Sequence, residues 1–268
     1  MCLVLLGLQS HLELPFILAA NRDEFYDRPT APAEFWNDTP GVLAGRDLSA
    51  GGTWLGIDRR GRFAAVTNYR QGEREHQAPR SRGRLVSDFL RGKMTAREHW
   101  QQVQRTAREY SGFNLLVGDS EGVLYYSNRE DRLRALGPGI YGLSNHLLDS
   151  PWPKVTSSKA TFGALMNGEP PELTASLFAL LGDRTRPAVD LLPSTGVGLE
   201  WEQLLSSAFI VSESYGTRCS TVVLVQQDGR VVFIERSFGP GGVAAGEVHF
   251  SFQLDPSSLL NRASSSAL

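Results

Sequence analysis

The cysteine at position 2 is the residue of this chain best suited to act as a nucleophile. A small residue in this place favours removal of Met1, which would give Cys2 a free α-amine. That amine has a reference pKa of about 7.7–8.0, so it can act as a base at neutral pH. One residue would then supply both nucleophile and base, as in N-terminal threonine nucleophiles. The alternative is that Cys2 is a small buried residue of the first strand.

Four consecutive polar residues directly follow the apolar run Phe16–Ala20. Because side chains alternate along an extended chain, Asn21 and Asp23 lie on one side, and Arg22 and Glu24 lie on the other. An arginine and an aspartate at the end of a strand can orient and polarise a nucleophile. The cluster is therefore either part of a catalytic site or a strand-end network of ion pairs.

Three more polar residues are candidates for holding a charged intermediate. Asn68 and Asn145 each follow an expected strand, where an amide N–H can donate to a developing oxyanion. As isolated residues, both asparagines are more simply explained as turn formers. Arg218 precedes the last expected hairpin, where it would hold an anion or pair with a carboxylate.

The elements that must position these residues are mostly strands, indicated by branched and aromatic runs between turn signals. The turn Asp58–Gly61 predicts a hairpin, with Gly61 in a left-handed turn position. Thr95 and Glu98 form a capping box before an amphipathic helix that continues towards Tyr110. The expected strands are Leu3–Leu8, Phe16–Ala20, Thr53–Ile57, Arg62–Thr67, Phe113–Gly118, Val123–Tyr126, Ile140–Leu143, Phe209–Ser212, Ser220–Val225, Val231–Glu235 and Val248–Leu254. The expected helices are two after Arg84, then Pro153–Met166, Leu173–Leu181 and a short piece over Trp201–Leu205.

Two segments are expected to be irregular. Asn21–Gly52 is long, polar and contains prolines, and loops of this length are often functional. Arg70–Arg84 is rich in arginine, and its simplest interpretation is a solvated loop followed by a helix start. In Gly51–Gly56, glycines surround one tryptophan, which indicates either a close backbone approach beside a pocket wall or a turn before a core tryptophan.

The order is strands, two helices, strands, two helices, strands, with hairpins and without strict βαβ alternation. This order favours an α+β fold in which antiparallel sheets carry helices in layers, and it argues against a doubly wound sheet. No phosphate-binding glycine motif supports nucleotide binding. We expect one domain over residues 1–254 and a frayed C-terminal tail over residues 255–268.

Composition excludes several classes of protein. With 27 basic and 29 acidic residues the net charge is −2, so no global field favours nucleic acid or an anionic membrane. The five histidines are scattered, which argues against a histidine metal site. Two cysteines suit a reducing compartment, and no membrane-spanning segment or secretory signal is visible. These features predict a soluble cytoplasmic protein without a metal or integral membrane association.

Taken together, the motifs resemble the NRDE family, the transport and Golgi organisation protein family. The resemblance covers nearly the whole chain, from Met1 to about Leu254. The N-terminal motifs that carry it are Met1-Cys2, Asn21-Arg22-Asp23-Glu24-Phe25-Tyr26, Arg28-Pro29, Gly45-Arg46-Asp47, Gly51-Gly52-Thr53-Trp54-Leu55-Gly56 and Thr67-Asn68-Tyr69. The later ones are Gly112-Phe113-Asn114-Leu115, Tyr141-Gly142-Leu143-Ser144-Asn145, Pro151-Trp152-Pro153-Lys154 and Tyr215-Gly216-Thr217-Arg218.

The resemblance implies an N-terminal-nucleophile hydrolase-like fold, a four-layer αββα sandwich with Cys2 as nucleophile. By more distant similarity to the cysteine amidases of that superfamily, Asp23 would hold the nucleophile's amine and Arg218 would support the thiolate. Asn68 and Asn145 resemble the two asparagines of the oxyanion site and the amine's surroundings. In bile-salt hydrolases an arginine stands three residues before the aspartate; here Ala20 occupies that place and Arg22 is adjacent to Asp23 instead.

Two functions follow from this resemblance, and they leave open whether the chain is an enzyme. The first is an N-terminal cysteine hydrolase or acyltransferase that needs no cofactor and acts on an amide or thioester of a small acylated substrate. The second is a non-catalytic protein that binds or traffics haem or an acyl ligand, since some members are linked to haem trafficking. The sequence has no haem attachment motif and names neither the substrate nor the oligomeric state.

Overall fold

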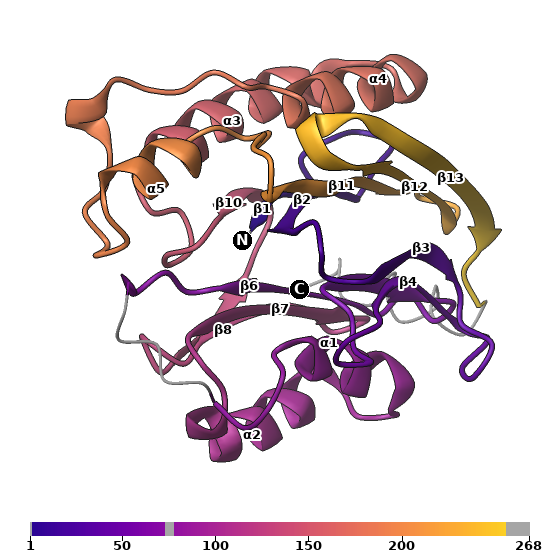
Figure 1. Ribbon diagram of the computed structural model, residues 1–268. Helices are drawn as coiled ribbons and strands as arrows, with labels where there is room; N and C mark the ends of the chain where they lie inside the picture. The colour runs from indigo at the N-terminus through magenta and orange to yellow at the C-terminus, as the bar shows by residue number, and fades with distance from the viewer. Residues whose placement is uncertain (1, 73–77, 256–268) are drawn as a thin grey trace.

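The computed structural model describes residues 2–72 and 78–255, apart from the side chain of residue 171. Two antiparallel sheets lie face to face, and helices cover the outer face of each (Figure 1). The α+β fold with two antiparallel sheets is therefore confirmed, and the arrangement has the expected order helix, sheet, sheet, helix.

The first sheet has six strands in the order β10-β1-β2-β11-β12-β13. Its central strands are long because apolar residues fill both faces, as expected for a sheet covered on both sides. The strands are β1 (Cys2–Leu8), β2 (Phe16–Phe25), β10 (Gly139–Leu143), β11 (Tyr215–Val225), β12 (Arg230–Phe238) and β13 (Ala244–Gln253).

The second sheet has seven strands, each paired with its neighbours in chain order. It is a meander of hairpins apart from the helical excursion between β6 and β7. The strands are β3 (Thr30–Phe35), β4 (Val42–Asp47), β5 (Leu55–Asp58), β6 (Phe63–Asn68), β7 (Phe113–Asp119), β8 (Gly122–Ser127) and β9 (Arg132–Leu136).

The helices form the two outer layers (Figure 1). Helices α1 (Gly83–Arg91) and α2 (Ala96–Thr106) pack on the second sheet. Helices α3 (Pro153–Ala164) and α4 (Pro170–Leu181) pack on the first, and the short α5 (Leu199–Leu204) precedes β11. Short 3₁₀ turns cover Ala107–Glu109, Leu165–Asn167, Val189–Leu191 and Pro240–Gly242.

The core follows from strand alternation. Val4 and Leu6 of β1 point between the sheets, where they meet side chains of the second sheet such as Tyr125. Leu3 and Leu5 point the other way, against α3 and α4. Cys2 has the same parity as Val4 and Leu6, so the fold directs its side chain towards the space between the sheets.

Several local predictions are confirmed. Asp58–Gly61 closes the β5–β6 hairpin, with Gly61 at φ 74°. Thr95 and Glu98 make both hydrogen bonds of a capping box at the start of α2. Pro153 stands in the first turn of α3, where its missing N–H costs no helical hydrogen bond.

The expected loop over Asn21–Gly52 is wrong, because β2 continues to Phe25 and this segment also forms β3 and β4. The polar residues of β2 stay in the sheet because their side chains find buried partners. Pro32 is tolerated because β3 is an edge strand.

The expected strand over Phe209–Ser212 is also wrong: this segment turns before β11 and makes no ladder. The strand β9 was not expected. In the segment Arg70–Arg84, which was expected to be solvated, Arg70 is buried, and residues 73–77 lie outside the described residues. The expected frayed tail, apart from Asp255, and Met1 lie outside the described residues. In the part of the chain that the structure describes, no helix is long and apolar enough to cross a membrane.

Candidate active site

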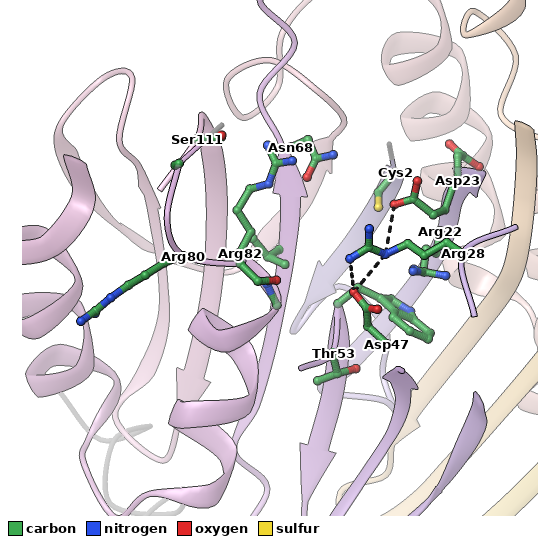
Figure 2. Close-up of a pocket in the computed structure, with 16 residues that line it drawn as sticks. Cys2, Arg22, Asp23, Arg28, Asp47, Thr53, Asn68, Arg80, Arg82 and Ser111 are labelled. Atoms are coloured by element: carbon green, nitrogen blue, oxygen red, sulfur yellow. Dashed lines mark hydrogen bonds and ion pairs between the residues drawn. The ribbon is translucent and has the colours of Figure 1, made fainter. Parts of the chain in front are cut away.

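The thiol of Cys2 lies in the wall of a cavity of about 380 Å³ between the two sheets (Figure 2). Cys2 pairs with Arg22 across β1 and β2, and Arg22 pairs with Cys219 across β2 and β11. Cys2 is 9% exposed, so the thiol reaches solvent only through the cavity. Burial raises the pKa of this thiol, while the charge of Arg22 and a hydrogen bond from the backbone N–H of Asp23 lower it.

A chain of hydrogen bonds fixes the backbone of Cys2 to both sheets. Ser144 Oγ donates to the Cys2 carbonyl at 2.9 Å, and Thr67 Oγ1 donates to the Ser144 carbonyl at 2.6 Å. Asn114 Nδ2 donates to Thr67 Oγ1 at 3.1 Å and is itself held by Tyr125. Buried and satisfied networks of this kind are rigid, so Cys2 has one defined position.

Asp23 lies one position beyond Arg22 on β2, beside the start of β1 (Figure 2). It is 1% exposed, and its Oδ1 accepts a hydrogen bond from Thr217 Oγ1 at 2.8 Å. Burial raises the pKa of this carboxyl, and the charge of Lys154 and the Thr217 hydroxyl oppose the rise. The negative charge of Asp23 also raises the pKa of the Cys2 thiol, so this carboxyl lies close to Cys2.

The alternation predicted for Asn21–Glu24 holds in the structure. Asn21 faces the helical layer, where Nδ2 donates to the carbonyls of Leu181 and Ala208 at 2.8 Å each. On the other face, Glu24 lies 4.0 Å from Arg28. The strand thus presents an anchoring face and a cavity face.

Arg22 lies on the cavity face of β2. Its Nη1 donates to Thr30 Oγ1 at 3.0 Å, and its guanidinium stacks 4.2 Å from the centre of the Trp54 ring. The ring lies against Gly45, where any Cβ would come within 2.4 Å of it. Among the described residues, no carboxylate lies within 4 Å of the Arg22 guanidinium. Arg22 is thus a buried cation beside the thiol.

The two candidate asparagines have different places. Asn68, at the end of β6, lines the cavity opposite Cys2 (Figure 2). Asn145 is fully buried and does not line the cavity; its Nδ2 donates to the Asn68 carbonyl at 3.0 Å. The structure therefore brings Asn68 to Cys2, and Asn145 holds Asn68 in place.

Arg218 is not brought to the cavity. It occupies a bulge in β11, between Thr217 and Cys219, so its side chain leaves the regular ladder. Its Nη1 donates to the carbonyls of Phe25 and Arg28 at 2.7 and 3.0 Å. These contacts fix the turn after β2 and leave Arg22 as the arginine beside the thiol.

Two buried basic residues near the site were missed by the sequence analysis. Arg70 forms a buried ion pair with Glu202, Nη1 to Oε2 at 2.6 Å. Lys154 Nζ donates to the Leu205 carbonyl at 2.9 Å, and burial lowers the pKa of Lys154 to about 8. The only sequence signal was that Lys154 ends one family motif and Arg70 directly follows another, because nothing local indicates that a basic residue is buried.

The far wall of the cavity comes from the segment before α1. Ser81, Arg82 and Gly83 line it together with Ser111. A Cβ on Gly52 would come within 2.6 Å of the Gly83 backbone, so the glycine-rich segment allows the close backbone approach considered from the sequence. No group of three or more metal-ligating side chains is found among the described residues.

Comparison with protein families and relatives gives one consistent match. The model of the family "Transport and Golgi organisation 2" matches residues 1–240. The chain is 42% identical over 241 residues to the Transport and Golgi organization protein 2 homolog of Bos taurus. It is 39% identical over 237 residues to the human homolog. Each alignment covers 82% of this chain and 86% of the relative.

Two solved structures match this chain with TM-scores just below 0.5. A C2A mutant of conjugated bile acid hydrolase from Clostridium perfringens matches with a TM-score of 0.48 and 9% identity, over 95% of this chain and 92% of that one. A Caenorhabditis elegans ortholog of N-acylethanolamine-hydrolyzing acid amidase matches with a TM-score of 0.47 and 13% identity, over 83% and 92%.

Proposed function

The chain belongs to the Transport and Golgi organisation 2 family, and we propose that it is an N-terminal cysteine hydrolase or acyltransferase. Its substrate class is an amide or thioester of a small acylated molecule. The observation that supports this proposal most is the position of Cys2. Its thiol lines a cavity, its backbone is held by Ser144, and the carboxyl of Asp23 lies beside the start of its strand.

The reaction begins when removal of Met1 gives Cys2 a free amine. The amine takes the thiol proton, and the resulting thiolate attacks the substrate carbonyl carbon. The negative charge of Asp23 stabilises the ammonium that forms, and the charge of Arg22 stabilises the thiolate. The Asn68 side chain, which lines the cavity, donates a hydrogen bond to the carbonyl oxygen as it becomes an oxyanion.

Collapse of this intermediate breaks the bond to the leaving group. The Cys2 ammonium returns its proton to the leaving amine or thiol, and the acyl group stays on Cys2 as a thioester. Water, or an acceptor nucleophile, then attacks this thioester with the free amine as base. The products are a carboxylic acid or a transferred acyl group, and the thiol is restored without a cofactor.

The test compares two proteins that differ only at the N-terminus. One is released from a fusion with Cys2 first, and the other carries one alanine before Cys2, which converts the amine into an amide. We expect turnover of acyl amides or thioesters only with the first form, and none with its Cys2→Ala variant. Intact mass of the protein from its native host then shows which form exists.

Equal turnover by both forms, or by Cys2→Ala, would refute the mechanism. No turnover by either, together with saturable binding of haem or an acyl ligand to both, would replace it with the non-catalytic carrier. Among the described residues that line the cavity, Cys2 is the only side chain of a class that ligates haem iron. In that outcome, haem binding that survives Cys2→Ala would locate the ligand elsewhere.

A further inference from the structure

Among the described residues, the Arg22 guanidinium makes no direct ion pair with a carboxylate. A buried charge is stable when it is paired, and an isolated one is costly. Arg22 is 6% exposed, and the only hydrogen bond of its side chain among the described residues goes to the neutral hydroxyl of Thr30. A guanidinium carries five N–H donors, so most of this donor capacity remains for a ligand in the cavity.

The other acidic residues of the cavity are engaged elsewhere. Asp47 pairs with Arg28 at 2.7 Å and also accepts backbone N–H groups of its own turn. Glu24 Oε2 lies 4.0 Å from Nε of the same arginine. Asp23 belongs to the opposite face of β2, where it meets Thr217. Outside the cavity, the buried carboxyl of Glu235 does feel the charge of Arg22, but it accepts hydrogen bonds from the Ala33 N–H and the Thr221 hydroxyl. None of these carboxylates forms an ion pair with Arg22.

A second guanidinium enters from the far wall. Arg82 Nη1 donates at 3.0 Å to the Gly112 carbonyl, which also accepts the backbone N–H of Tyr69. The Arg82 guanidinium therefore lies next to Asn68, across the cavity from Arg22 (Figure 2). Arg80, by contrast, points away from the cavity and pairs with Glu109.

We propose that the substrate of Cys2 is anionic and that its carboxylate or phosphate binds between Arg22 and Arg82. This inference rests on the proposed function and narrows its substrate class. Arginine suits both groups because its planar fork can donate two parallel hydrogen bonds to their oxygens. The bound anion balances the buried charge of Arg22 and places the scissile carbonyl between Cys2 and Asn68.

The test uses two alkylating reagents of nearly equal size and does not need turnover. Iodoacetate is anionic and iodoacetamide is neutral, and both transfer a two-carbon group to a thiolate with loss of iodide. The rate of each at Cys2 is measured by peptide mass spectrometry on the full chain. The ratio of the two rates cancels the fraction of thiolate, so it reports attraction of the anion alone. The same measurement on the full chain unfolded in urea gives the reference ratio.

We expect the native ratio of iodoacetate to iodoacetamide rates to exceed the urea reference at least tenfold. Arg22→Gln and Arg82→Gln each lower it about tenfold, as expected for a lost charged hydrogen bond, and Arg22→Lys keeps part of it. Arg236→Gln, which removes an exposed charge paired with Glu247 on the same sheet, leaves it unchanged. Salt at 0.5 M lowers only the native ratio, because it screens the charges.

Protection experiments separate the two anions. Acetylglycine is the carboxylate probe and methyl phosphate the phosphate probe, each competing with iodoacetamide for Cys2 in the native protein. If one probe slows the alkylation of Cys2 in the native protein and does not slow it in Arg22→Gln, that probe identifies the anionic group that is bound. A native ratio equal to the urea reference, or no alkylation of native Cys2 by either reagent, would overturn the proposal. Neither result depends on hydrolysis, so failure of the hydrolase proposal is seen separately.

Discussion

Replacement of Asn21 should weaken the whole fold because its side chain joins β2 to the helical layer. Asn21 is 1% exposed, and Nδ2 donates to the Leu181 and Ala208 carbonyls at 2.8 Å each. Its Oδ1 accepts from Ser220 Oγ at 2.6 Å. Asn21→Ala removes all three hydrogen bonds and leaves two carbonyls and a hydroxyl buried without them.

The size of the effect follows from these three groups. A buried polar group that loses its partner costs about 1–3 kcal/mol. Shifted neighbours or water partly replace the lost hydrogen bonds. We therefore expect the three groups together to lower the unfolding free energy by about 4 kcal/mol, in the lower part of the range for three such groups. In a protein of this size each kcal/mol lowers the melting temperature by about 2–4 °C, so we expect a loss of about 8–16 °C.

Asn21→Asp gives a pH-dependent version of the same test. The carboxylate keeps the shape but faces two carbonyl oxygens, so the folded state favours the protonated acid and its pKa rises above the unfolded value of about 3.9. The unfolded chain then binds fewer protons than the folded one between these two values. The unfolding free energy of Asn21→Asp therefore falls, relative to the original protein, as pH rises from 5 to 8.

Urea unfolding followed by circular dichroism measures both effects at a series of pH values. Asn37→Ala is the matched control, because Asn37 is exposed in a turn and should change stability by less than about 0.5 kcal/mol. A loss below about 1 kcal/mol for Asn21→Ala, or a pH-independent difference for Asn21→Asp, would show that β2 is not held to the helical layer in this way.

Three other consequences can be measured separately. Glu202→Gln leaves the buried charge of Arg70 without its ion pair and should cost about 3–5 kcal/mol of unfolding free energy. The double variant Arg70→Met with Glu202→Leu removes both charges and should cost much less. Equal losses for the two variants would contradict this account. Lys154 has its pKa lowered from 10.5 to about 8, so the stability of the original protein relative to Lys154→Met should rise by about 3 kcal/mol between pH 8 and 10.5. A flat difference would show that the amine stays charged over this range and that burial does not lower its pKa. With Met1 retained, burial raises the pKa of the Cys2 thiol above 9.0, so its alkylation rate should still be increasing at pH 9; a plateau near pH 8 would exclude that shift.

The sequence was sufficient wherever local patterns decide the structure. Alternating apolar runs, the glycine turn at Gly61 and the capping box at Thr95 each depend on a few neighbouring residues. The order of hairpins and paired helices predicts antiparallel sheets with helices packed on them. The four-layer order was implied by the family resemblance. The family resemblance then directed attention to Cys2, Asp23 and Asn68, which the structure brings to one place.

Sequence patterns were insufficient to predict the structure where it depends on partners that are distant in the chain. Val42–Asp47 was predicted to belong to a polar loop because prolines and charged residues lie nearby in the sequence. It forms β4 because β3 and β5 pair with it on both sides. Arg70 was predicted to be solvated because its ion-pair partner Glu202 is distant in the sequence. Arg218 was assigned to the thiol by analogy, and no pattern could reveal that a bulge turns it towards Phe25.

The four residues Asn21–Glu24 show how one short strand can serve both faces of a sheet. The odd positions face the helical layer: Asn21 anchors the strand there, and Asp23 lies beside the start of β1. The even positions face the cavity: Arg22 brings a positive charge to the thiol of Cys2, and Glu24 lies on the arginine of the next turn. Because the two sets alternate, a shift of one residue in register would exchange them. The anchoring of Asn21 is therefore a condition for the chemistry of its neighbours, and its loss should disturb the Cys2 alkylation ratio even at temperatures where the chain stays folded.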